Sequence, residues 1–412
     1  MNPIPDEPGR IVRGSDDYRR AGRSLFVAGA ATFGMLYSVQ PLLPEFAREF
    51  GQTPAGASLT LSVSTVLLAA ALPIAGLLSD RIGRKRVMEA SLLLASLICL
   101  AAALAPGFAS LLALRALLGI LLAGLPAVAM TYLAEEMDPA SLGAAMGLYI
   151  SGNSIGGLAG RGAVSTISDL AGWRWGVGAV ALCGLLAAWQ LMRRLPEPRR
   201  SAANRTTPQE MLAHSRRHLR RPVLLALFGI GAVLMGGFVT LYSYLAFRLL
   251  APPFELPQAW VGWIFILFLT GSVSSPFMGR LRDRRAALGL ALGLLAAGLA
   301  LTLPEQLGLT LLGTALFTAG FFGGHAVASA WVGAAAPAGR AQASSLYLLF
   351  YYAGSSLGGT AGGLAWSADG WPGVVRLIGG MLAAGLLLWL ALCLLPSARL
   401  SARPYDLDKG ER

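Results

Sequence analysis

Long apolar runs recur from one end of this 412-residue sequence to the other. Each run is close to the roughly 20 residues that a helix needs to cross the hydrocarbon layer of a membrane. Backbone amides and carbonyls find no water there, so each run is expected to be helical. We expect twelve spans, near residues 24–46, 57–79, 87–105, 109–133, 143–166, 174–195, 222–249, 258–280, 286–303, 307–334, 341–366 and 372–395. The sequence therefore predicts an all-α membrane protein.

Charge supports this prediction by its amount and by its position. Only 13% of the residues are charged, about half of what a soluble globular domain carries. The net charge of +12 is also compatible with nucleic-acid binding. However, most of the 33 Lys and Arg residues fall in the two tails and in alternate loops, which is the bias of segments that stay in the cytoplasm. We therefore expect a lipid bilayer as the partner, no nucleic acid, and both termini in the cytoplasm.

The sequence predicts neither a cofactor nor a metal. Cys99, Cys183 and Cys393 lie inside apolar runs without the spacing of metal ligands. There is also no Gly-x-x-x-x-Gly-Lys-Ser/Thr loop to hold a nucleotide. If the chain transports a solute, an ion gradient is the expected source of energy.

The two halves of the sequence repeat one another. Three pairs of similar segments are separated by 202, 203 and 205 residues: Gly152–Gly160 with Gly354–Gly362, Gly76–Arg81 with Gly279–Arg284, and Leu36–Ser38 with Leu241–Ser243. Near-equal offsets in matching spans indicate two related six-helix halves, a plan that places a solute site at the interface of the repeats. The expected parts are a tail (1–23), a bundle (24–195), a linker (196–221), a bundle (222–395) and a tail (396–412).

Several motifs resemble one transporter family. The string GLLSDRIGRKR at Gly76–Arg86 resembles the loop between spans two and three of the major facilitator superfamily. The strings YSVQPLLPEFAREFG, GNSIGGLAGR and GFFGGHAVASAWVG are similar to its bacterial sugar- and drug-efflux branch, often labelled arabinose-efflux-permease-like. The resemblance implies two pseudo-symmetric six-helix bundles, secondary transport by alternating access, no enzyme activity, and a monomer in the inner membrane.

The loop motif is the first candidate for gating. Gly76 allows a close helix approach and Gly83 a tight turn. Asp80 is placed to accept hydrogen bonds from the free amides at a helix start or to pair with a neighbouring arginine. The family resemblance implies that Asp80, Arg81 and Arg84 form a latch between the two halves. Asp283 would have the same role in the second half. The alternative is a positively charged cytoplasmic loop that sets topology alone.

Three ionisable residues inside the spans are candidates for ion coupling. Arg115 is costly at its depth unless it is paired or hydrated, and it resembles the span-four arginine that the family links to proton coupling, with Leu118 where Gln is usual. Arg161 lies near a span end, so snorkelling is an equal alternative. His325 titrates near neutral pH; a structural role is its equal alternative.

Glycines in span five predict close helix packing. Gly152, Gly156, Gly157 and Gly160 give this span a smooth face. The run resembles the antiporter motif of the family, with Asn153 where proline is expected, and therefore favours export. The alternative is packing without any bearing on the direction of transport.

The family lines its cavity with spans one, four, seven and ten. This resemblance assigns the cavity to six polar or aromatic residues: Tyr37, Gln40, Thr131, Tyr132, Tyr242 and Tyr244. Tyrosines suit sugars and amphiphilic aromatic solutes equally, and a tyrosine belt at the membrane surface is the alternative. We expect proton-coupled efflux of a small organic solute. An uptake symporter or a uniporter is the alternative, and a non-transporting sensor is disfavoured because both tails are short.

Overall fold

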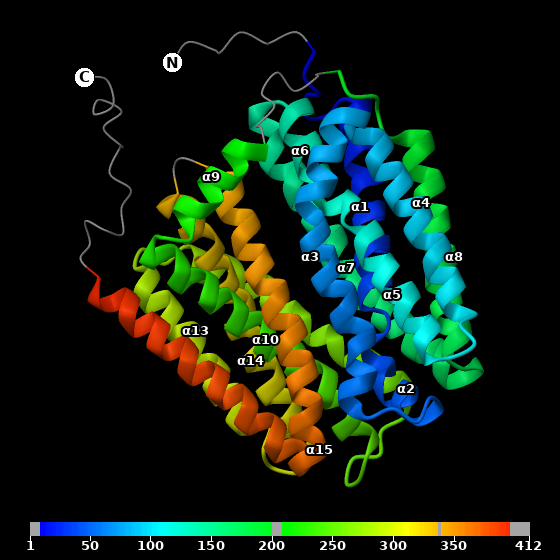
Figure 1. The fold of residues 1–412 in the computed structure, drawn as a ribbon, viewed down its shortest axis with the longest axis vertical. Coiled ribbons are helices and arrows are strands. Elements are labelled where there is room, and N and C mark those ends of the chain that lie inside the picture. Colours follow the sequence, from blue (N-terminus) through cyan, green and yellow to red (C-terminus); the bar gives the residue numbers. More distant parts are fainter. Residues whose placement is uncertain (1–8, 200–207, 337–338, 396–412) are drawn as a thin grey trace. The chain divides into compact units, whose positions relative to one another are not determined.

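The computed structural model describes residues 9–199, 208–336 and 339–395, and Figure 1 shows the fold. Throughout these residues the regular structure is helical, apart from one isolated bridge between Ile11 and Met137. By their contacts the residues form two compact units. Unit 1 comprises the described parts of 1–52, 57–205 and 255–265, and unit 2 those of 53–56, 206–254 and 266–412.

Ten helical stretches of the described chain are long and apolar enough to cross a membrane. One of them, Gln342–Leu394, lies in α15 (Arg340–Leu394) and contains two spans, because the backbone leaves helical geometry at Asp369 and Gly370. α7 (Pro139–Ala171) has 33 residues but is too polar to count among the ten; its glycines, serines and Arg161 reduce its hydropathy. With α7 included and α15 divided, the predicted twelve spans are present.

Most spans are single helices. In unit 1 these are α4 (Arg84–Ala103), α7, α8 (Trp173–Arg194) and, for most of its length, α3 (Pro54–Ile82). In unit 2 they are α10 (Pro222–Leu250), α13 (Arg284–Leu301) and α14 (Leu307–Ala335). Gly83 separates α3 from α4 at a φ of 107°, a value that side chains rarely allow. The tight turn expected at Gly83 is therefore present.

Three spans are interrupted. Span one consists of α1 (Asp16–Tyr37), η1 (Gln40–Leu42) and α2 (Leu43–Glu49). Pro41 and Pro44 occupy the first turns of η1 and α2, because proline lacks the amide that would continue the preceding helix. Span four consists of α5 (Phe108–Leu122) and α6 (Gly124–Glu136), and span eight of α11 (Gln258–Trp263), η2 (Ile264–Phe268) and α12 (Leu269–Gly279).

A short helix outside the spans, α9 (Pro208–His218), packs against α15 in unit 2. His218 Nε2 lies 3.0 Å from the carbonyl oxygen of Gly339. Because a carbonyl only accepts, the proton of the neutral ring lies on Nε2. Burial lowers the pKa of His218, so the ring is neutral at physiological pH.

Glycines place the backbones of α1 and α7 in direct contact, as the sequence predicts for span five. A Cβ added at Gly156 would lie 2.2 Å from Ala30 Cα, and one at Gly160 would lie 2.6 Å from Gly34 Cα. Unit 2 repeats this contact between α10 and α15, where a Cβ at Gly354 would lie 2.1 Å from the Ala232 carbonyl oxygen. The sequence repeat therefore corresponds to one helix pair that is built in the same way twice.

This contact gives a matched pair of predictions. Gly156→Ala is expected to lower the free energy of unfolding by about 1–3 kcal/mol, because the added methyl group meets backbone that no rotamer change moves away. Gly147→Ala, on the same helix, has nothing within 4 Å of its Cβ and is expected to leave stability unchanged or to raise it slightly. Thermal unfolding of both purified variants checks this; equal melting temperatures would contradict it.

Candidate functional site

The predicted loop motif forms a charged network in unit 1. Arg84 Nη1 lies 2.5 Å from Asp80 Oδ1. The same guanidinium donates to both carboxylate oxygens of Glu135, from Nη2 at 2.8 Å and from Nε at 3.1 Å. A two-point bond of this kind fixes direction as well as distance. Asp80 and Arg84 are therefore brought together with a carboxylate of α6, which links the loop to span four.

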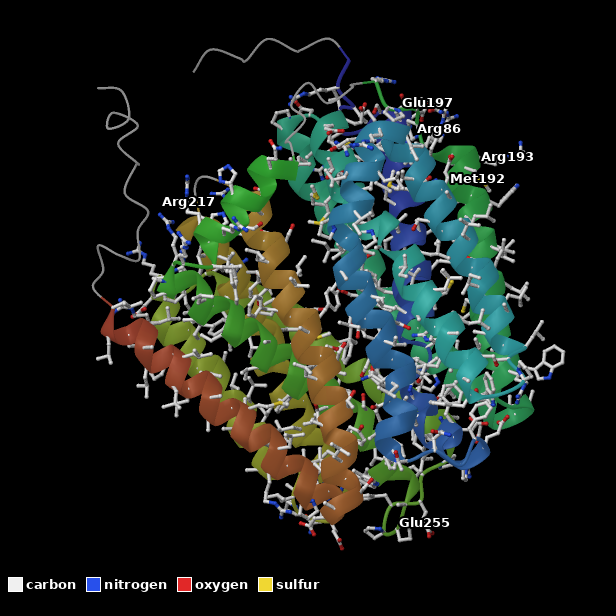
Figure 2. The ribbon with its side chains drawn as sticks, viewed as in Figure 1. Arg86, Met192, Arg193, Glu197, Arg217 and Glu255 are labelled. Atoms are coloured by element: carbon white, nitrogen blue, oxygen red, sulfur yellow. The ribbon has the colours of Figure 1, made fainter. Side chains whose placement is uncertain are left out.

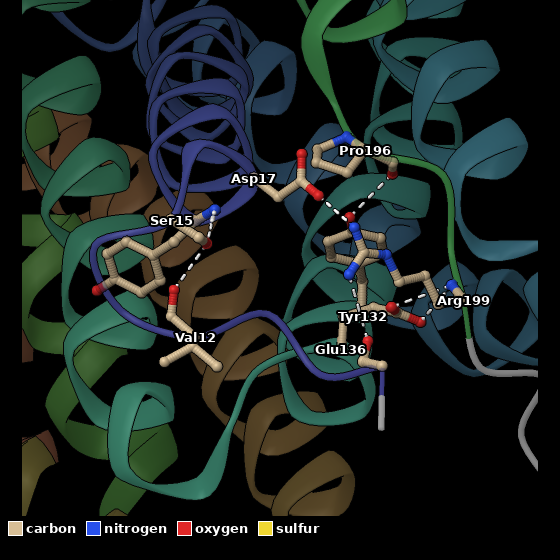
Figure 3. Close-up of polar contacts among 9 residues, drawn as sticks. Val12, Ser15, Asp17, Tyr132, Glu136, Pro196 and Arg199 are labelled. Carbon is tan, nitrogen blue, oxygen red and sulfur yellow. Dashed lines mark hydrogen bonds and ion pairs between the residues drawn. The ribbon is translucent and has the colours of Figure 1, made fainter. Parts of the chain in front are cut away.

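Residues of the tail and the linker meet beside this network, at the end of α6 (Figure 3). The buried Glu136 carboxylate accepts the Arg199 amide with both oxygens at 3.0 Å, and its backbone oxygen accepts from the Ile11 amide at 2.8 Å. The Arg199 side chain pairs with Asp17. Figure 2 shows Arg86, Arg193 and Glu197 at this same end of unit 1, and Glu255 at the opposite end.

Arg115 is almost completely buried and binds the broken end of span one. Its side chain donates to the carbonyl oxygens of Met35 at 3.1 Å and Leu36 at 2.6 Å. Its Nε donates to the Thr60 carbonyl oxygen at 2.9 Å. The last carbonyls of a helix have no partner within the helix and attract cations. Arg115 therefore caps α1 and joins it to α3.

Arg161 is also buried, and it lies where two interrupted spans meet. Its Nε donates to Gln40 Oε1 at 2.9 Å. Its guanidinium lies 4.3 Å from the Tyr37 ring centre and 4.4 Å from that of Phe265. Aromatic faces attract cations, and more strongly away from water. The structure thus places Arg161 between η1 of span one and η2 of span eight, and snorkelling is not observed.

The start of span eight packs on α7 through small residues. A Cβ at Gly262 would lie 2.3 Å from Ser165 Cβ, so the two helices touch. Gln258 Nε2 donates to the Pro41 carbonyl oxygen at 2.8 Å and reaches Ser165 Oγ at 3.3 Å. We call the contact between α11 and α7 the α7–α11 seam; all of it lies within unit 1.

Two candidate residues of unit 2, Tyr242 and His325, belong to one aromatic cluster, in which Phe238 and Phe321 lie between them. Tyr242 and Thr318 share a hydrogen bond between their hydroxyls at 2.8 Å. His325 Nδ1 lies 2.8 Å from the Tyr347 hydroxyl. Tyr244 is buried and donates to the Gly359 carbonyl oxygen at 2.5 Å. Tyr242 and His325 therefore lie in one cluster, whereas Tyr244 binds the backbone of α15.

Other predicted residues have local roles in the structure. Tyr132 is buried and donates to the Pro196 carbonyl oxygen at 2.9 Å, and Thr131 bonds its own helix at Ala127. Asp283 caps α13 by accepting from the Arg285 amide at 2.9 Å. Arg81 is exposed. A Cβ added at Gly76 would have no atom within 4 Å. The Gly157 carbonyl oxygen accepts a hydrogen bond from Arg161. Their roles in the cavity, the latch and helix packing stay predictions.

Sequence reasoning missed several residues of these clusters. Gln258, Gly262 and Phe265 lie in the interrupted part of span eight, where no unusual charge drew attention to them. No motif distinguishes Glu136 or Tyr351 from the other acids and tyrosines of the sequence. The nearest signal was Val261-Gly262-Trp263, a glycine between large residues near the start of a span. Within the described residues no three His, Cys, Asp or Glu side chains gather closely enough to hold a metal ion.

Comparison with known proteins assigns the family. The model of the Major Facilitator Superfamily matches residues 25–256. The MFS-type transporter YybF of Bacillus subtilis is 46% identical over 384 residues, covering 92% of this chain and 95% of its own. The chain belongs to the major facilitator superfamily. The inner membrane transport protein YnfM of Escherichia coli is 44% identical over 380 residues, covering 92% of this chain and 91% of its own.

Solved structures of the superfamily agree with the fold. A bacterial homolog of the human lysosomal transporter Spinster, inward-facing and occupied, superposes with a TM-score of 0.78 at 17% identity. The match covers 95% of this chain and all of that one. The family and its curated relatives make the chain a multi-pass membrane transporter for a small solute and not an enzyme.

Proposed function

We propose that this major facilitator protein exports a small organic solute in exchange for protons by alternating access. The observation that carries the proposal is the convergence of two buried arginines on the broken end of span one. Arg115 binds its last carbonyls, and Arg161 binds Gln40 just beyond them. Interrupted helices that meet ionisable residues inside the membrane are how secondary transporters build sites near the bilayer midplane.

The α7–α11 seam is the proposed moving contact. It joins span five to the start of span eight, while the chain beyond Phe265 belongs to unit 2. Small residues, the Trp263 ring against Gly162 and a few hydrogen bonds hold it, among them Trp263 Nε1 to Thr166 Oγ1 at 3.0 Å. We propose that the seam is closed in one access state and open in the other.

The proposed direction of transport and its coupling to protons rest on other residues. Export is supported by the glycine contact of α1 and α7, which resembles the antiporter motif of the family. Span one carries no acid between Ser24 and Pro44, and Glu135 is bonded to Arg84. We propose His325, which titrates near neutral pH when unperturbed, as the proton carrier; the carboxylates near span ends, Glu45 and Asp169, are the alternatives.

Orientation, membrane and oligomeric state complete the proposal. The arginine-rich tail and linker, which meet at Glu136, face the cytoplasm by the bias of basic residues toward that side. The protein is accordingly placed in the inner membrane with both termini in the cytoplasm. Each chain contains both halves of the repeat, which supports a monomer as the transporting species.

A gradient assay in proteoliposomes tests the exchange. The probes are labelled L-arabinose and labelled phenyl β-glucoside, one for each solute class. An exchanger accumulates its probe when the lumen is acidic, and a protonophore abolishes this accumulation. Accumulation driven by an acidic exterior would identify a symporter instead, and equilibration without a gradient effect a uniporter. Failure of both probes to move would reject this choice of solute classes.

A further inference from the structure

Unit 2 contains a continuous group of aromatic side chains drawn from α10, η2, α14 and α15. Four of them are partly exposed, and we call these the aromatic wall: Phe268, Phe322, His325 and Tyr351. Four more are buried behind them: Phe238, Tyr242, Phe321 and Tyr347. Phe322 and His325 are three residues apart on α14 and so share one face of that helix.

The rings of this group are held in fixed orientations. Phe238 and Phe321 stack at 3.8 Å between ring centres and 12° between planes. Phe268 meets Phe322 at 5.7 Å, and His325 meets Tyr351 at 4.8 Å. The second and third of these pairs lie in the range of roughly 4.5–7 Å in which ring pairs gain energy beyond the burial of their area. The wall is therefore supported by packed neighbours, as a binding surface requires.

The wall is partly exposed, and its one residue that titrates near neutral pH when unperturbed is His325. Among the described residues His325 forms one hydrogen bond, through Nδ1 to Tyr347, and the side chain stays partly exposed. An imidazole nitrogen against lipid is costly, so ionisable groups inside membrane spans face cavities. His325 Nε2 is consequently available for a ligand. The bond to Tyr347 holds Nδ1 in place, and Nε2 lies on the other side of the ring.

The chemistry of the wall selects among solutes. None of the eight side chains carries a permanent charge, and His325 is charged only while it carries the proton, so in its neutral state the group offers planar faces and little to balance an ionic ligand. The hydroxyls of Tyr242 and Tyr347 are already bonded, to Thr318 and to His325. A sugar needs several hydrogen-bonding partners, whereas an aromatic ring needs stacking faces and a single polar contact fixes its orientation.

We propose that the transported solute is a neutral compound whose planar aromatic ring stacks in the aromatic wall, beside Tyr351 and Phe322, while a neighbouring polar group bonds His325 Nε2. This assignment rests on the proposed function and names the solute class of that transporter. The wall determines specificity for the ring, and His325 holds the polar group.

The test uses two probes that share one polar group. Phenyl β-glucoside and cyclohexyl β-glucoside differ only in whether the ring is aromatic and flat. Binding to the purified full-length protein is measured by isothermal titration in detergent without any gradient, so failed coupling does not affect the result. We expect phenyl β-glucoside to bind at least about threefold more tightly, in line with the worth of aromatic stacking.

Variants separate the two contacts. Tyr351→Leu is expected to abolish the preference for the phenyl probe, and Tyr351→Phe to keep it. His325→Leu is expected to weaken both probes equally, since they share the glucosyl group. Tyr347→Phe is the control for the His325–Tyr347 bond, and thermal unfolding confirms that each variant is folded. Equal affinity for the two probes, no binding of either, or an unchanged preference in Tyr351→Leu would each overturn the proposal.

Discussion

Arg115→Ala abolishes transport and also lowers the thermal stability of the purified protein; this is the largest effect that we expect from one side chain. The carbonyl oxygens of Met35, Leu36 and Thr60 lose their guanidinium donor inside a membrane span. Ser38 Oγ still donates to the Met35 oxygen and Ser64 Oγ to the Thr60 oxygen, so the largest loss falls on the Leu36 oxygen, whose bond to Arg115 is 2.6 Å long. A buried polar group without a partner costs about 1–3 kcal/mol. Because the same side chain caps α1 and joins it to α3, its loss loosens the broken end of span one.

Two further variants make this prediction specific. Arg115→Lys keeps the charge, but one ammonium group does not reproduce the planar fork that reaches carbonyls on two helices. We expect it to recover part of the stability and little of the transport. Arg193→Ala removes an exposed arginine at the end of α8 and serves as the control. The assays are thermal unfolding and probe uptake; a stable, active Arg115→Ala protein would contradict the assigned role.

The spans themselves were predictable from sequence. Apolar length, the basic loops and the repeat are properties of the chain alone, and the twelve predicted spans are present in the structure. The break in span one was also signalled, because Pro41 and Pro44 disfavour a continuous helix. The break in span eight was not signalled. Proline in that span occurs only at Pro276, inside α12, so η2 has no local cause in the sequence.

Residue roles were less predictable, because they depend on partners far along the chain. For Arg161 the sequence is equally compatible with a functional role and with a side chain that snorkels to the membrane surface. In the structure its guanidinium lies between the rings of Tyr37 and Phe265. The loop string around Asp283 repeats that around Asp80, yet Asp283 caps its own helix whereas Asp80 pairs with Arg84. A motif specifies which side chains are available, and tertiary contacts decide which of them meet.

The second large effect, a loss of transport, is expected when a covalent cross-link holds the α7–α11 seam closed. Gln258 Nε2 lies 3.3 Å from Ser165 Oγ, so cysteines at these two positions lie within reach of a short, reducible bifunctional thiol reagent. Cys99, Cys183 and Cys393 are replaced first. Alternating access requires the seam to open in every cycle, and a covalent link prevents this while leaving the remaining packing in place.

Probe uptake by the Ser165→Cys, Gln258→Cys protein before cross-linking, after it and after reduction therefore tests the central claim most directly. The two single-cysteine proteins, treated in the same way, are the controls. We expect uptake to stop on cross-linking, to return on reduction, and to stay unaffected in the controls. Full uptake by a protein shown to be cross-linked would contradict alternating access through this seam.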